Sequence, residues 1–170
     1  MMKDNHVLTY LLFVVAQTIL SNYFHFTPFI TISILPAMAF LIHPKINSVW
    51  AMAIAFGTGL AVDFFAEGTI GINAASLVPV ALLRRPLIEA LCGNEPFEQK
   101  ESISIRKYGF ARISLAIILM QVLFNTIYTV ADCAGTRPFW FIAARIGASA
   151  LASYVVSMLI VNPLTYDDRR

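Results

Sequence analysis

Five polar side chains stand inside long apolar stretches of this 170-residue sequence and are its first candidates for chemistry. They are Gln17, Asp63, Asn73, Asn125 and Arg145. An ionisable group within a membrane-spanning segment faces the interior of its bundle and pairs with another polar group. Asp63 and Arg145 have opposite charges and fall at similar depths in their stretches. We therefore predict an intramembrane polar network of these five residues, with an ion pair or shared hydrogen bonds between Asp63 and Arg145.

Two roles are open for this predicted network. A buried ion pair would fix the third apolar stretch against the sixth, because removing one partner leaves a buried charge at a cost of about 3–5 kcal/mol. Alternatively, the same side chains would line a polar pocket open to the outside, as in a substrate-binding subunit of a transporter.

Motifs of the common enzyme classes are missing from the sequence. It contains no HExxH, no GxSxG and no P-loop pattern. Asp63 and Asp132 do not form the paired aspartates of an intramembrane protease, and the three histidines fall near the ends of apolar stretches. Cys92 and Cys133 have no metal-ligand spacing. We expect no enzymatic activity, no metal and no cofactor.

The composition is that of a membrane protein. Hydrophobic residues make up 58% of the chain and charged residues 13%, whereas about a quarter of the residues of a soluble domain are charged. Several apolar runs approach the roughly 20 residues that a membrane-spanning helix needs. We predict an all-α integral membrane protein, a compact bundle of six transmembrane helices forming one domain over residues 1–170.

Six apolar segments define the predicted helices, and the second of them is unusual. The helices are expected over about 6–24, 29–42, 48–65, 70–91, 110–131 and 139–164. The segment 29–42 is short for a bilayer and carries Pro36, so it could also be tilted or re-entrant.

The basic residues give this bundle an orientation. With six spans and a cytoplasmic N-terminus, the outer side receives Arg137 as its single basic residue outside the helices, and the remaining basic residues except Arg145 fall inside. Both termini are then cytoplasmic. The connection over about 84–109 is also cytoplasmic and rich in basic residues; it is either a charge belt at an anionic leaflet or a loop that docks a partner.

Small residues recur every four positions in the last segment. Ala144, Ala148 and Ala152 form one row, and Ser149, Ser153 and Ser157 run alongside it. Such rows let helix backbones approach closely in lipid. We predict a helix-packing face here, used either within the bundle or by the transmembrane helix of another protein.

One stretch resembles a known family. The sequence FGTGLAVDFFAEGTIG at residues 56–71 is followed by the apolar INAASLVPVALL, and its marker residues are Gly57, Gly59, Asp63, Gly68 and Gly71. This pattern resembles the rod shape-determining protein MreD family. The chain length, the short outer loops and the basic connection before the fifth predicted helix are also similar to that family.

The resemblance implies a non-enzymatic membrane scaffold of the bacterial cell-elongation machinery, which builds peptidoglycan and maintains rod shape. Its implied partners are membrane lipid and an MreC-like bitopic protein, and through the latter an MreB-like filament, a RodA-like glycosyltransferase and a class B penicillin-binding protein. No nucleic-acid partner is expected. The implied location is the bacterial cytoplasmic (inner) membrane.

The same resemblance keeps a second function open. The family looks similar in fold to the membrane-embedded S-components of vitamin-uptake transporters. The alternative is therefore a substrate-binding membrane subunit of a small-molecule uptake transporter.

Overall fold

The computed structural model of the chain describes residues 6–23, 30–67, 70–93, 95–98, 105–133 and 137–166. Regular structure in these ranges is helical throughout, which confirms the all-α prediction. The elements are α1 (His6–Tyr23), α2 (Leu35–Leu41), α3 (Ser48–Val62), the π-helical turn η1 (Asp63–Glu67), α4 (Ile72–Cys92), α5 (Glu95–Glu98), α6 (Ile105–Tyr108), α7 (Phe110–Cys133) and α8 (Phe139–Tyr166).

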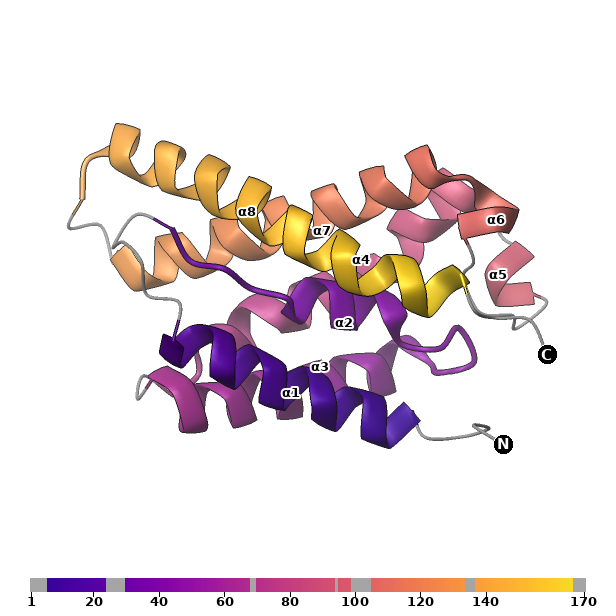
Figure 1. The fold of residues 1–170 in the computed structure, drawn as a ribbon, viewed down its shortest axis with the longest axis horizontal. Helices are drawn as coiled ribbons and strands as arrows, with labels where there is room; N and C mark the ends of the chain where they lie inside the picture. The colour runs from indigo at the N-terminus through magenta and orange to yellow at the C-terminus, as the bar shows by residue number, and fades with distance from the viewer. Residues whose placement is uncertain are drawn as a thin grey trace.

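The long elements run between the two ends of an elongated bundle (Figure 1). One end, here called the α5 end, holds the start of α1, the connection from α2 to α3, the short helices α5 and α6 and the end of α8. The other end, here called the Asp63 end, holds η1 and the start of α4. The most extensive contacts join α3 to α4, α4 to α7 and α7 to α8.

Within the described residues, three helices are long and apolar enough to cross a membrane: Ser48–Ala66, Phe110–Cys133 and Phe139–Val161. A shorter apolar helical run, Tyr10–Asn22, lies in α1. The helix α4 has 21 residues but carries two arginines in its second half. The part of the chain that the structure describes therefore contains three helices of membrane-spanning character, and six spans remain a prediction.

The distribution of side chains is inverted relative to a soluble protein. Large apolar side chains such as Trp50, Leu151 and Leu159 are exposed, whereas Asp63 and Gln121 are completely buried. Water-soluble domains rarely expose such extensive apolar surface. This arrangement is consistent with a bundle whose outer surface faces lipid.

The prediction of a helix over 29–42 is wrong for residues 30–34, which are not helical. Figure 1 shows this non-helical segment running past α8 into α2. Three isoleucines alternate with Thr31 and Ser33, and β-branched residues favour extended backbone. The helix begins only at Leu35, with Pro36 in its first turn, where the missing N–H costs nothing.

The extended conformation lets a short segment reach across the bundle. Extended residues rise about 3.3 Å each and helical residues about 1.5 Å; because Ile34 already has helical dihedrals, residues 30–41 reach about 25 Å. The same residues would reach only about 18 Å as a helix.

The connection predicted over 84–109 begins later than expected. Despite Pro79 and Pro86, α4 continues to Cys92 and ends at Gly93, whose φ of 83° is readily adopted only by glycine. Residues 84–92 therefore belong to a packed helix, and the short helices α5 and α6 follow.

The backbones of α3 and α4 approach closely at Gly59. A Cβ atom added there would lie 2.5 Å from the Cα of Ala74 and 2.7 Å from its backbone nitrogen. No side chain fits at that distance, because the obstacle is backbone. Gly57, two residues earlier, meets no atom within 4 Å.

We expect opposite effects from alanine at these two glycines. Gly59→Ala should destabilise the bundle by about 1–3 kcal/mol, because α4 must move away from α3. Gly57→Ala, the matched control, should be neutral or stabilising by up to about 1 kcal/mol, because alanine favours helix. Thermal unfolding of the purified variants in detergent measures both. Equal unfolding temperatures for the two variants would contradict the close approach.

Candidate functional site

The carboxylate of Asp63 caps the N-terminus of α4. One carboxylate oxygen accepts hydrogen bonds from the backbone N–H of Asn73 at 3.0 Å and from its side-chain amide at 2.9 Å. The other oxygen accepts from the backbone N–H of Gly71 at 2.9 Å and of Ala74 at 3.3 Å. The first N–H groups of a helix have no partner inside the helix, and a negative charge there also favours the helix dipole.

The cap depends on the glycines near it. Gly59 lies one helical turn before Asp63 and lets α4 approach α3 closely enough for the carboxylate to reach its first turn. Gly71 precedes α4 with a φ of 105°, a conformation that favours glycine. Asp63 itself begins η1, directly after α3 ends.

The predicted ion pair between Asp63 and Arg145 is wrong. Arg145 instead pairs with Asp132 of α7, with a guanidinium nitrogen 2.6 Å from a carboxylate oxygen. The reason is the packing of the helices: α3 contacts α4 and α1, whereas α8 contacts α7 (Figure 1). Asp132 is the second-last residue of α7, and Arg145 lies in the second turn of α8, the next helix along the chain.

The three predicted amides do not form one network with these charges. Asn73 joins Asp63 at the start of α4. Asn125 donates to the backbone carbonyl of Gln121 on its own helix at 2.9 Å and, at 3.5 Å, to the side-chain oxygen of Gln121. Gln17 bonds to the extended residues instead. The predicted network is thus divided among several places in the bundle.

A row of serines on α8 binds the backbone of the extended residues. The hydroxyl oxygen of Ser149 accepts from the N–H of Thr31 at 3.0 Å, and that of Ser153 accepts from the N–H of Ser33 at 2.9 Å. Four helical residues rise about 6 Å and two extended residues rise about 6.6 Å. The serine spacing therefore matches every second residue of the extended chain.

Two glutamines complete the partners of this extended chain. The Gln17 side chain accepts from the N–H of Ile34 at 2.8 Å and donates to the carbonyl of Ile32 at 3.3 Å. The Gln121 side chain donates to the carbonyl of Ser33 at 3.0 Å and to the hydroxyl of Ser157 at 2.7 Å. Helices α1, α7 and α8 thus all hold the same few residues.

The buried face of α8 is the serine row. Ser149, Ser153 and Ser157 are completely buried, whereas Ala144 is exposed and both Ala148 and Ala152 are only partly buried. The predicted alanine face lies beside the packed one, because serines supply the hydrogen bonds that the extended chain requires.

The family markers fall into different classes. Gly59 and Gly71 are required by close packing and by backbone conformation, and Asp63 is a cap. Gly57 meets nothing nearby, and Gly68 lies outside the described residues.

Two residues that act in these networks were missed by sequence analysis. Gln121 is a lone polar residue in an apolar run, like Gln17, and the same criterion would have found it. Asp132 stands at the end of α7 and is distinguished only by its closeness to the α7–α8 connection.

These hydrogen bonds and the Asp132–Arg145 ion pair can hold the bundle together. Two buried side-chain atoms on α7 have no hydrogen-bond partner. These are the side-chain oxygens of Asn125 and Thr129. Within the described residues, no group of three or more His, Cys, Asp or Glu side chains could hold a metal. No family model, curated protein or solved structure matches this chain.

We expect Asp63→Ala to destabilise the bundle by at least about 2 kcal/mol, because it leaves several buried N–H groups of α4 without an acceptor. Asp63→Asn keeps one oxygen acceptor and should cost less. Thermal unfolding in detergent measures both variants.

Combining these changes with Arg145→Gln tests the revised pairing. Because Asp63 and Arg145 have separate partners, their effects should add to within about 0.5 kcal/mol. A larger coupling between them would show that they share one network after all.

We expect Ser153→Ala to lower stability by about 1–2 kcal/mol, because the buried N–H of Ser33 loses its acceptor. Thr126→Ala is the matched control, since that hydroxyl bonds only to the carbonyl of Val122 on its own helix. Hydrogen exchange at residue 33, measured by mass spectrometry, should speed up in Ser153→Ala and stay unchanged in the control. Unchanged exchange in both variants would contradict the proposed anchoring.

Proposed function

We propose that this chain is a non-enzymatic membrane scaffold of the bacterial cell-elongation machinery, located in the cytoplasmic membrane with both termini inside. The resemblance of residues 56–71 to the MreD family names the machinery. The proposed partners are an MreC-like bitopic protein and, through it, an MreB-like filament, a RodA-like glycosyltransferase and a class B penicillin-binding protein.

The observation that carries the scaffold proposal is the use of the buried polar side chains. Asp63 bonds to the start of α4, and Gln17 and Ser153 bond to the extended residues 30–34. These side chains satisfy the protein's own backbone, so they serve the shape of the bundle. A rigid bundle of this kind suits a protein that works by presenting its outer surface.

Part of that surface supports contact with another transmembrane helix. In the first half of α8, Ala144 and Gly147 are exposed, and a Cβ atom added at Gly147 would meet nothing within 4 Å. Small exposed residues allow a second helix to pack closely in lipid. We therefore place the partner helix beside this part of α8.

A substrate-binding subunit of an uptake transporter remains the second candidate. The unpartnered oxygens of Asn125 and Thr129 favour it, because buried acceptors of this kind can receive hydrogen bonds from a ligand. Interrupted membrane segments such as residues 30–41 also occur at transporter binding sites.

Depletion of the protein in its native cells distinguishes the two candidates. The scaffold proposal expects rod-shaped cells to become round and to stop elongating, with uptake of small molecules unchanged. Normal shape combined with the loss of uptake of one vitamin would overturn the scaffold and support the transporter subunit.

Complementation of the depleted cells tests the proposed partner surface. Gly147→Leu should fail to restore rod shape and should lose co-purification with the bitopic partner, because the larger side chain holds the partner helix away. Gly57→Leu is the matched control, since it is also an exposed helical glycine with open space around it. Both variants should keep the wild-type unfolding temperature. Full complementation by Gly147→Leu would place the interface elsewhere.

A further inference from the structure

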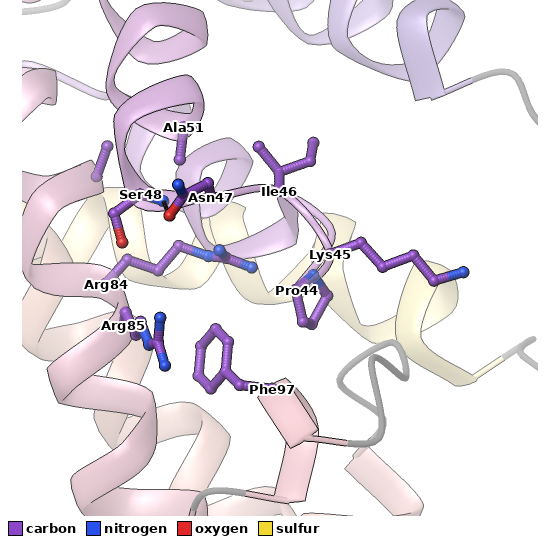
Figure 2. A pocket seen from close by; sticks show the side chains of 10 residues that line it. Pro44, Lys45, Ile46, Asn47, Ser48, Ala51, Arg84, Arg85 and Phe97 are labelled. Atoms are coloured by element: carbon purple, nitrogen blue, oxygen red, sulfur yellow. Dashed lines mark hydrogen bonds between the residues drawn. The ribbon is translucent and has the colours of Figure 1, made fainter.

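A cavity of about 220 Å³ opens at the α5 end of the bundle. It lies between the start of α3, the second half of α4 and the short helix α5 (Figure 2). The polar and charged residues at its walls are Lys45, Asn47, Ser48, Arg84 and Arg85. The cavity is larger than the roughly 30 Å³ that one water molecule occupies in the liquid, so it has room for a small polar group.

Arg84 is a buried cation at this cavity, with 2% of its surface exposed. Its Nε donates to the carbonyl of Phe40 at 3.4 Å, and a terminal nitrogen donates to the carbonyl of Ile42. These bonds cap the C-terminal end of α2 and use two of the five N–H groups of the guanidinium. Among the described residues no carboxylate pairs with it, so no acidic side chain of the described part of the chain balances its charge.

Further positive charge surrounds the same space. Arg85 lies beside Arg84, and the ring of Phe97 lies 6.0 Å from the guanidinium carbon of Arg84 and 5.3 Å from that of Arg85. The N-terminus of α3, where the Asn47 side chain accepts from the N–H of Ser48, adds the positive end of a helix dipole. Figure 2 shows the Lys45 side chain extending away from Arg84, so the two arginines are the principal cations.

Two nearby carboxylates, Glu89 and Glu98, line a second pocket with Arg85, and Glu89 pairs with it directly. Glu89 accepts from Arg85 at 2.7 Å, in a pair one helical turn apart on α4. About half of the Arg85 side chain is exposed, and an exposed pair of this kind contributes little free energy. An incoming anion can therefore share Arg85 with Glu89.

We propose that this cavity binds the phosphate group of an anionic phospholipid. Phosphate oxygens accept paired N–H bonds from guanidinium groups, and they would balance the buried charge of Arg84. Trp50 and Val49, in the first turn of α3 next to Ser48, are exposed by 69% and 70%. Trp side chains favour the membrane interface, and this apolar turn offers the acyl chains a surface beside the headgroup.

The site does not depend on which proteins the chain binds. Its chemistry would also suit a soluble phosphate compound, so the test contains an arm for each source. Arg84 is not the variant of choice, because its loss would also uncap α2.

The first arm measures lipid retention by native mass spectrometry. The delipidated full chain in non-ionic detergent is incubated with equal amounts of phosphatidylglycerol and phosphatidylcholine. We expect the wild type to retain phosphatidylglycerol with a preference of at least about fivefold, since one basic residue at an anionic surface contributes about that factor. Arg85→Gln should lower the preference by about fivefold and leave only the part that Arg84 supplies. Glu89→Gln should increase it, because Arg85 is then free.

Arg112→Gln is the matched control. Arg112 is an exposed arginine near the start of α7 that does not line the cavity. It should keep the wild-type preference. The absence of a preference in the wild type, or an equal loss in Arg85→Gln and Arg112→Gln, would overturn the site and leave only a general basic belt.

The second arm titrates inorganic phosphate at constant ionic strength and follows thermal unfolding, with chloride as the reference. We expect much less stabilisation than with phosphatidylglycerol, because the acyl chains are missing. If phosphate stabilised the wild type but not Arg85→Gln, while lipid retention showed no preference, the lipid assignment would be wrong and the ligand would be a soluble phosphate compound.

Discussion

Backbone N–H and C=O groups that leave a helix inside an apolar bundle need hydrogen-bond partners, because neither lipid nor apolar side chains supply any. This chain meets the requirement at three breaks in its helices. Asp63 serves the start of α4, the serine row and two glutamines serve residues 30–34, and Arg84 serves the end of α2. The close contact at Gly59 and the positive φ of Gly71 follow from the first of these.

The sequence predicts the long elements well, because α3, α7 and α8 are set by long, predominantly apolar runs. The extended residues could also have been predicted, since ITISI alternates β-branched apolar and small polar residues with a period of two and Pro36 follows closely. The partner of Asp63 could not have been predicted from the sequence. Opposite charge and similar depth do not determine which helices are neighbours. A comparison of charged side chains also cannot show that the backbone N–H groups at the start of α4 need an acceptor.

The two ends of the bundle use charge in different ways. At the Asp63 end, N–H groups at the start of α4 donate hydrogen bonds to the carboxylate, so the carboxylate stabilises the backbone of the protein itself. At the α5 end, only some of the N–H groups of Arg84 bond to the end of α2. The guanidinium group also lines a cavity. A ligand bound there would also hold Arg84 against α2, so occupancy of the cavity and the position of α2 are physically linked.

The extended residues have a consequence for the order of assembly. Ser149 and Ser153 follow Thr31 and Ser33 in the chain by 118 and 120 residues. When residues 30–34 leave the ribosome, the serines that complete their hydrogen bonds have not yet been synthesised. The hydrogen bonds of this segment cannot be completed in chain order, as those of an independent helix can. The backbone N–H groups of the segment gain these partners only when α8 has been synthesised and packed. Until then, water or another protein must supply their hydrogen-bond acceptors.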